Sequence, residues 1–273
     1  MTLQPGCRFV IAPHFHLAAD WSRRLLVGAG VEEVNGCFFP LHSWRPPTSD
    51  ELAVLLWTSE MPTPPEELET SVCLFQLPGH LRSEWWTRLE QGAGALGETG
   101  LPGFETFVRQ VVQFLDFKNL PVPEGARCTV IVSNPGQRSV SWRPESHGPG
   151  GLRSNLAPSV PWRRADEPGW PRLWGAINLG DEETSVVLID LPCRQLEAEL
   201  CRRFPDQAAP ASVGELSGQF LRSFPDYPPV RLILGPGEGY RLPRGGLICD
   251  AYLPDKQEPD VLMLISQESS PAP

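Results

Sequence analysis

The chain has 273 residues and a net charge of −10, and 41% of its residues are hydrophobic and 21% charged. This composition is typical of a folded globular protein, and the length allows one large domain or two small ones. The acidic excess argues against non-specific binding to nucleic acid and against docking on an anionic membrane.

The targeting and redox signals favour a bacterial cytoplasm. No run of 18 apolar residues occurs, so we expect no transmembrane helix, and the start MTLQPGCRFVIAPHFH lacks the pattern of a secretory signal. The seven cysteines form no CxxC pair and are odd in number, which favours reduced thiols over disulfides or structural zinc. The preference for arginine over lysine, with abundant Pro, Gly and Trp, suggests a GC-rich bacterial genome.

The first part of the chain predicts alternating short strands and helices, because 31 prolines and 25 glycines interrupt longer elements. We expect strands within 7–13, 34–42 and 70–78, and a short helix within 83–94. The clearest helix lies within 101–117. Its apolar residues fall on one stripe at helical spacing: Phe104, Phe107, Val108, Val111, Val112 and Leu115.

The second part of the chain predicts mainly strands. Residues 127–142 read as a hairpin around an NPGQ turn, and residues 172–192 read as a second hairpin around LGDEE. Helices follow within 193–206 and 212–226, and strands within 230–243, 245–252 and 260–266. We therefore predict an α+β, mainly β fold. It forms a single domain over 1–266, with an N-terminal α/β portion (1–125), a sandwich or barrel core (126–266) and a disordered tail (267–273).

Four short segments suggest a relationship: GGLRSN (150–155), AINLG (176–180), GEGYRLP (237–243) and LICDA (247–251). Their order resembles the double-stranded β-helix, or jelly-roll, of the Fe(II)/2-oxoglutarate oxygenase and cupin superfamily. It looks closest to uncharacterised bacterial members, whose segments read GLHxD, INLG and LLHDG. The resemblance covers about half of the chain. It implies a jelly-roll core with helices packed on one face.

The resemblance also implies a ligand set, and here the sequence departs from the family. The first histidine of the family falls on Arg153, the acid on Asn155 and the second histidine on Cys249. A guanidinium has no lone pair to donate, a carboxamide is a weak ligand, and one thiolate is not a metal site. The co-substrate anchor is also missing from strand 260–266. Lys256, Arg241 and Arg244 all precede that strand, so we predict neither metal nor cofactor.

Two interpretations of these positions remain open. Arg153 with Asn155 could clamp a carboxylate or stabilise an oxyanion, and Cys249 could be a nucleophile or acid–base group if the arginine lowers its pKa. Alternatively, Arg153 pairs with an acid and Cys249 is a small buried apolar residue. The predicted substrate contacts are Arg153, Trp162, Trp174, Asn178 and Tyr240. The cluster of Trp162, Trp170 and Trp174 with Arg163, Arg164 and Arg172 forms either cation–π contacts over a pocket mouth or a pinned surface loop.

A rival metal site is also open. His14 and His16 would lie on one side of a strand, with Asp20 nearby, although aromatic packing at the end of a strand is the favoured explanation. His147 lies close to GGLRSN and is a further candidate ligand.

Three functions follow. The first is a jelly-roll protein without its iron triad that binds a small molecule or peptide, with or without metal-independent chemistry, in a bacterial biosynthetic pathway. The second is a genuine Fe(II)/2-oxoglutarate oxygenase with other ligands, and the third is a non-catalytic interaction or scaffold protein. The oligomeric state is left open.

Overall fold

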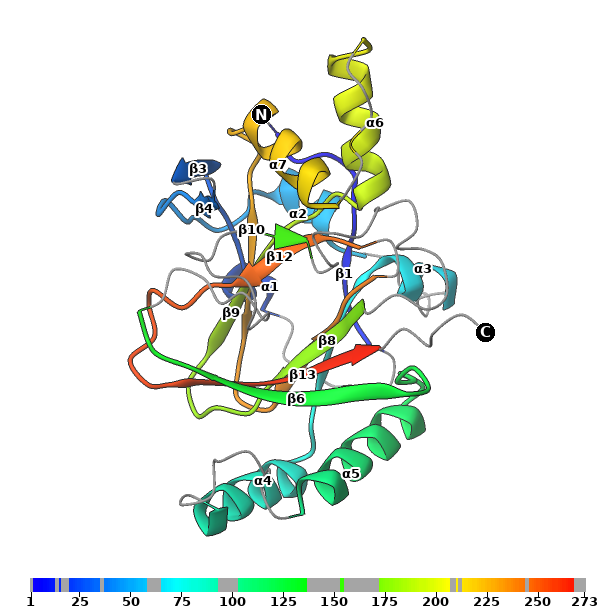
Figure 1. Ribbon diagram of the computed structural model, residues 1–273, viewed down its shortest axis with the longest axis vertical. Coiled ribbons are helices and arrows are strands. Elements are labelled where there is room, and N and C mark those ends of the chain that lie inside the picture. The colour runs from blue at the N-terminus through cyan, green and yellow to red at the C-terminus, as the bar shows by residue number, and fades with distance from the viewer. Residues whose placement is uncertain are drawn as a thin grey trace.

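The computed structural model describes residues 2–12, 15, 20–34, 37–57, 65–92, 103–136, 153–154, 172–206, 210, 213–243 and 246–267. These residues form a mixed α/β protein that consists mostly of sheet, in agreement with the predicted class (Figure 1). Of the predicted tail, Gln267 ends the last strand and the rest lies outside the described residues. Within the described part of the chain, no helix has the length and apolarity needed to cross a membrane.

Two larger sheets contain most of the strands. The six-stranded sheet has the order β1-β5-β11-β8-β13-β6, and the five-stranded sheet has the order β2-β10-β9-β12-β7. Only β1 and β5 pair in parallel among the described strands. The strands of the first sheet, in that order, are Phe9–Ile11, Val72–Gln76, Glu238–Arg241, Arg172–Asn178, Asp260–Gln267 and Ala126–Ser133. Those of the second are Leu25–Val27, Val230–Leu234, Thr184–Ile189, Ile248–Ala251 and Arg153–Ser154. A separate pair joins β3 (Val31–Val34) to β4 (Cys37–Pro40).

The last eight strands pair in a nested pattern. The outermost pair is β6 with β13, followed by β7 with β12, β8 with β11 and β9 with β10, and all four pairs are antiparallel. Successive pairs alternate between the six-stranded and the five-stranded sheet. Strands from the N-terminal portion extend both sheets, since β1 and β5 join the first and β2 joins the second.

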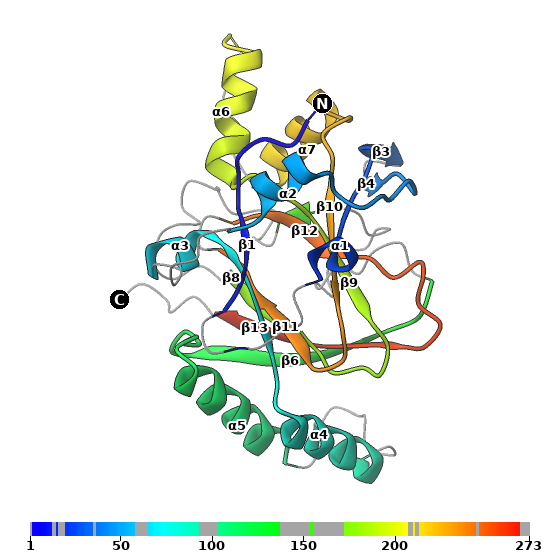
Figure 2. The ribbon, with the colours of Figure 1, turned by 180° about the vertical axis from the view of Figure 1, so that it is seen from behind.

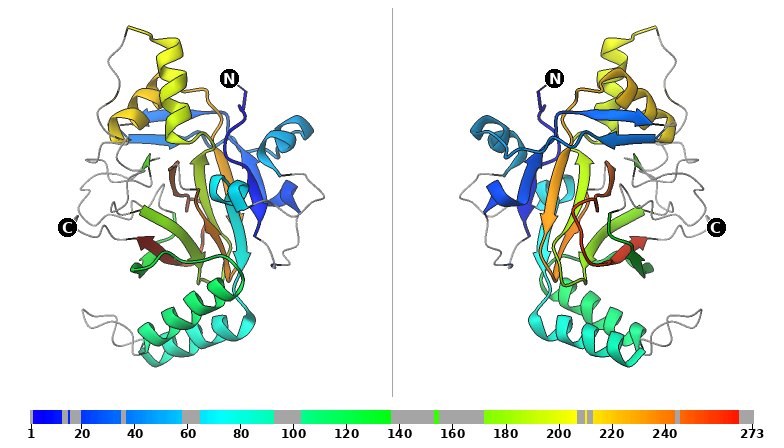
Figure 3. Two further views of the ribbon diagram at one scale, coloured as in Figure 1. Left: turned by 90° about the vertical axis from the view of Figure 1, so that its right-hand side faces the viewer. Right: turned by 90° about the vertical axis from the view of Figure 1, so that its left-hand side faces the viewer.

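The helices cover the two ends of the molecule (Figures 1 and 2). Helices α4 (Gly79–Gly92) and α5 (Phe104–Phe117) lie together beside the six-stranded sheet, while α6 (Cys193–Arg203) and α7 (Val213–Ser223) lie at the opposite end (Figure 3). The shorter helices are α1 (Trp21–Arg24), α2 (Ser49–Leu55) and α3 (Pro65–Thr70). Helix α2 begins with a capping box, in which Thr48 and Glu51 satisfy each other's backbone N–H groups.

Two apolar cores hold these layers together. In the first, α4 and α5 pack on the outer face of the six-stranded sheet: Phe107, Val111 and Leu115 of α5 are fully buried, as the predicted stripe requires. Their partners in the sheet include Phe75, Ile177 and Met263. The second core lies between the two sheets and continues beneath α6 and α7, and contains Leu188, Leu232, Tyr240 and Cys249 among others.

The alternation of side chains along β10 shows which face of the five-stranded sheet points inward. Arg231 points outward, because its guanidinium stacks on the ring of Tyr252 (4.6 Å) and pairs with Asp255, whose side chain is 64% exposed. Its neighbours Val230 and Leu232 therefore face the six-stranded sheet. In an antiparallel ladder, residues directly opposite one another share a face. Leu188 and Cys249, which lie opposite Val230 along the ladder, thus face inward too.

The predicted hairpin over 172–192 is wrong. Strand β8 lies in the six-stranded sheet and β9 in the five-stranded one, so the LGDEE segment carries the chain across from one sheet to the other. The predicted hairpin over 127–142 stays a prediction. Its first strand, β6, pairs with β13, and Gly136 donates its N–H to the carbonyl of Leu253 (3.0 Å). The second strand of that hairpin lies outside the described residues.

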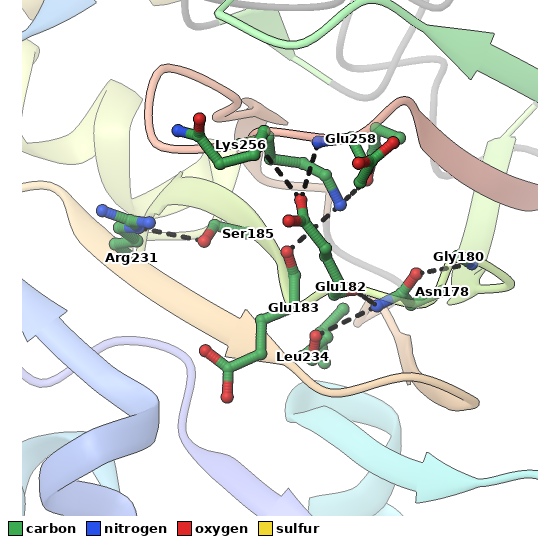
Figure 4. A network of polar contacts seen from close by, with 11 residues as sticks. Asn178, Gly180, Glu182, Glu183, Ser185, Arg231, Leu234, Lys256 and Glu258 are labelled. Carbon is green, nitrogen blue, oxygen red and sulfur yellow. Dashed lines mark hydrogen bonds and ion pairs between the residues drawn. The ribbon is translucent and has the colours of Figure 1, made fainter.

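Three polar groups fasten the end of the sheets at which β8 passes to β9. The buried Asn178 amide donates to the carbonyls of Glu182 (2.8 Å) and Leu234 (3.2 Å) and accepts from the N–H of Gly180 (2.9 Å) (Figure 4). The buried ammonium of Lys256 lies 3.1 Å from Asp260 Oδ1 and donates to the carbonyl of Glu183 (3.2 Å).

The third group is the pair of Arg24 and Glu238. Both terminal nitrogens of Arg24 donate to the carboxylate of Glu238 (2.5 and 2.7 Å), which also accepts from the N–H of Gly235 (2.7 Å). Arg24 directly precedes β2 of the five-stranded sheet, whereas Glu238 begins β11 of the six-stranded sheet. The pair therefore joins the two sheets, and we call this the clasped end.

Glu238→Gln should lower the free energy of unfolding by about 3 kcal/mol, because it removes the buried negative charge to which both terminal nitrogens of Arg24 donate. The matched control is Glu33→Gln, which removes the partner of Arg222 in an exposed pair and should cost less than about 0.5 kcal/mol. Urea unfolding curves of the two variants measure the difference. Equal losses would mean that the Arg24–Glu238 pair does not fasten the sheets.

Candidate functional site

The short strand β7 brings two predicted site residues together. Arg153 of β7 is the Cα partner of Cys249 of β12, and Ser154 is the partner of Ile248. The same rung continues through Leu188 of β9 to Val230 of β10. Residues that are far apart in the sequence thus lie side by side where the resemblance placed the ligands of the family. Asn155 follows β7 and lies outside the described residues.

This rung lies toward the end of the sheets that is opposite the clasped end. Strand β9 starts at Thr184, next to the clasp, and runs away from it to Leu188 and Ile189. Strand β12 runs in the opposite direction, so that Ile248 and Cys249 pair with Ile189 and Leu188. We call this end, with the rung through Arg153 and Cys249, the far end.

The environment of Cys249 favours a neutral thiol. Cys249 is 8% exposed and belongs to the core between the sheets. Burial, with smaller contributions from Asp250 and Cys193, raises the pKa of the Cys249 thiol well above its usual range. A thiol is nucleophilic only when it is ionised. The surroundings therefore favour Cys249 as a small apolar wall residue over Cys249 as a nucleophile.

Tyr240 lines the same core from the other sheet. It lies on β11, opposite Leu74 and Ala176, and is buried. Burial raises the pKa of the Tyr240 hydroxyl well above its usual range, and Cys249 adds to this rise, as Asp250 and Asp260 do. The hydroxyl therefore keeps its proton at neutral pH. Together, Cys249 and Tyr240 provide two protonated, weakly polar groups on the inward faces of the two sheets.

Two other predicted contact residues lie elsewhere. The polar atoms of Asn178 bond to backbone groups at the clasped end, so this residue acts as a structural link there. Trp174 packs in the core beneath α4 and α5, with its ring 6.2 Å from that of Phe75. Asn178 and Trp174 therefore do not lie next to Cys249. Trp162, Trp170, Arg163 and Arg164 lie outside the described residues.

The basic residues that could anchor a co-substrate are engaged in other contacts. Lys256 is held at the clasped end by Asp260 and Glu183. Arg241 donates to the carbonyl of Leu68 in α3 and to the sulfur of Cys73 in β5. Arg244 lies outside the described residues.

The donor chemistry at the β7–β12 rung does not fit a ferrous ion. A guanidinium cannot coordinate a metal, and a neutral buried thiol would first have to lose a proton that burial holds in place. Within the described ranges, no group of three or more His, Cys, Asp or Glu side chains could hold a metal. His14, His16 and His147 lie outside those ranges. Asp20 is described: it precedes α1 at the surface and accepts a hydrogen bond from Ser22 (2.6 Å).

Sequence reasoning missed a buried acid next to this end. Asp190 directly follows β9, is fully buried, and accepts a hydrogen bond from the hydroxyl of Tyr227 (2.7 Å). The only signal in the sequence is that a charged residue directly follows the apolar run SVVLI. Arg24 and Glu238 were missed for a different reason, since they are separated by 214 positions.

No protein-family model and no curated protein matches the chain. Among solved structures, the chain is similar to the Kdo hydroxylase KdoO, a non-heme Fe(II) alphaketoglutarate dependent dioxygenase. The structure of KdoO with cobalt(II) gives a TM-score of 0.41 at 13% identity, over 74% of this chain and 82% of that chain. The complex with alphaketoglutarate and Fe(III), and the apo structure, each give 0.40 at 14% identity, over 74% and 81%. Similarity at this level assigns neither a fold nor a chemistry to this chain.

The burial of Cys249 predicts its reactivity. At pH 7.5, N-ethylmaleimide should label the exposed Cys201 rapidly and Cys249 on the order of 100-fold more slowly, because Cys249 is buried and protonated. Peptide mass spectrometry over time measures both rates in the same sample, and the unfolded chain in denaturant should show similar rates for the two. Labelling of Cys249 as fast as that of Cys201 would show an accessible, ionised thiol.

Proposed function

We propose that strands β6 to β13 form a double-stranded β-helix, and that its far end binds an anionic small molecule or peptide without a catalytic metal. The nested pairing of the eight strands supports the first part, since a jelly-roll is a long antiparallel hairpin wrapped into two facing sheets. One observation carries the second part: the register sets Arg153 opposite Cys249, where a metal-binding member of the superfamily would carry two histidines.

An arginine at this rung would supply a permanent positive charge. A guanidinium binds a carboxylate through two parallel hydrogen bonds, which gives both affinity and orientation. The residue paired with Arg153 is Cys249, and Leu188 lies one strand further along the rung; both are buried. A charge-assisted hydrogen bond is stronger beside such surfaces, because the local dielectric constant is low. The proposed ligand is therefore a carboxylate with an apolar part.

Holding a ligand is better supported than acid–base catalysis. A general base must be deprotonated near neutral pH. Burial keeps both Cys249 and Tyr240 protonated, so neither is a base as it stands. The proposed site thus offers a cation from Arg153 and an apolar wall from the two sheets. We further propose that the protein acts in a bacterial biosynthetic pathway, by analogy with the family that it resembles.

A panel of carboxylates, including 2-oxoglutarate and succinate, tests this proposal in buffer with EDTA. At least one should raise the melting temperature by a few degrees, because a ligand at about 100 times its Kd stabilises the folded state by roughly 2.7 kcal/mol. Arg153→Ala should weaken binding of that carboxylate by about 10- to 100-fold, since charge-assisted hydrogen bonds contribute about 1.5–3 kcal/mol. Arg153→Lys should recover part of the loss.

The control is Arg203→Ala, which removes an exposed arginine at the end of α6 and should bind like the parent protein. Absence of stabilisation by every carboxylate, or equal stabilisation of the Arg153→Ala variant, would contradict the proposal. Stoichiometric iron in the purified protein together with turnover of 2-oxoglutarate would instead establish a genuine oxygenase, with ligands among residues such as His14, His16 and His147.

A further inference from the structure

Asp190 lies at a junction of three segments that are distant in the sequence. It follows β9 and precedes α6, and its carboxyl accepts from the hydroxyl of Tyr227, which lies between α7 and β10. The third segment is Thr2–Cys7. In Figures 1 and 2 the chain runs from this segment into β1.

The N-terminal segment is bonded directly to this junction. The N–H of Cys7 donates to the carbonyl of Asp190 (2.6 Å), and the N–H of Gln4 lies 3.4 Å from the hydroxyl of Tyr227. Gly6 passes so close that an added Cβ would lie 2.5 Å from the carbonyl oxygen of Asp190 and 3.1 Å from its Oδ2. The segment therefore covers the carboxyl, and only glycine allows this approach.

The carboxyl is incompletely satisfied in this position. Oδ1 accepts from Tyr227, but Oδ2 has no hydrogen-bond partner among the residues that the structure describes. The residue has no exposed surface. An ionised carboxylate there would lack both water and a second donor, which is a costly arrangement. A protonated carboxyl avoids most of this cost.

The charged surroundings offer no compensation. Among the described residues, the titratable groups that act on the Cys7 thiol or the Tyr227 hydroxyl at this junction are Asp190 itself, Cys193, Glu67 and Glu199, and none of these is a cation. Burial raises the pKa of the Asp190 carboxyl to about 7, although the hydrogen bond from Tyr227 lowers it in part. Ionisation thus falls within the physiological range of pH.

We propose that Asp190 is a protonation-dependent switch that holds the N-terminal segment Thr2–Cys7 against the end of β9 when protonated and releases it when ionised. Release of the segment gives the carboxylate access to water, which removes the penalty of burying its charge. Asp190 lies two residues beyond Leu188, so release loosens the same end of the five-stranded sheet that carries the rung through Cys249. The switch does not depend on what binds there.

Proton linkage gives the direction in which pH shifts the equilibrium between the closed and the released state. The closed state keeps the Asp190 proton up to about pH 7, whereas the released state loses it near the ordinary value of 3.8. Between these values the closed state binds more protons, so release becomes more favourable as pH rises, by up to about tenfold per pH unit. Above about pH 7 both states are ionised and the effect levels off.

Hydrogen exchange from pH 5 to pH 8 tests the switch in the full chain. After correction for intrinsic exchange rates, the protection factor of the Cys7 amide should fall by up to about tenfold per pH unit and level off above pH 7. Peptides from β8 and β13 provide the reference and should keep their protection. Asp190→Asn should hold the segment closed, with high protection at every pH. Gly6→Ala should release it, with low protection at every pH.

A flat profile in the parent protein would overturn the proposal. So would an unchanged slope in Asp190→Asn, which would assign the titration to another group such as Cys7 or Cys193. Parallel loss of protection in β8 and β13 would indicate global unfolding in place of a local release. If Asp190→Asn does not fold, the Tyr227→Phe variant tests the switch instead. It removes the donor that favours the ionised form, so the levelling-off must move to higher pH, and an unmoved profile would contradict the switch.

Discussion

The fold depends on satisfying the buried backbone groups where the chain passes from one sheet to the other. At such a crossing the strand ladder stops, and its last N–H and C=O groups lose their partners while still inside the protein. Asn178 provides the substitute partners between β8 and β9, since one amide serves two carbonyls and one N–H. Figure 4 shows that this amide and the ammonium of Lys256 lie in the same part of the structure. Both groups bond to the backbone of the turn, at Glu182 and Glu183.

The proposed ligand site lies at the end of the sheets opposite the clasped end. The Arg24–Glu238 pair links β2 to β11 across the two sheets, and the nested pairing then fixes the positions of the remaining strands relative to this link. The interior between the sheets is filled mainly by aliphatic side chains. In the proposed function, polar recognition comes from the far end, where the register sets the permanently charged Arg153 opposite Cys249.

Local elements could be predicted from the sequence, but their pairing could not. The apolar stripe on α5 identified its buried face correctly, because apolar residues at helical spacing all lie on one face of a helix, and that face packs on the sheet. The segment LGDEE predicted a reversal of the chain correctly and its sheet partner wrongly. A turn sequence encodes the change of direction, whereas the crossing is held by contacts with residues that are distant in the chain, such as the bond from Asn178 to the carbonyl of Leu234. The rung of Arg153 and Cys249 was accessible only through a family resemblance, since no local pattern connects the two residues.

Two buried acids show how similar groups acquire different roles in one fold. Glu238 receives three hydrogen bonds, two from a guanidinium and one from a backbone N–H, so its charge is balanced in place. Asp190 receives one from a phenol, and its second oxygen has no partner within the described residues. A carboxylate that is fully paired gains nothing when its surroundings open, whereas one that is poorly paired gains water. The number of donors at each carboxyl therefore makes the clasped end rigid and allows the N-terminal segment to respond to pH.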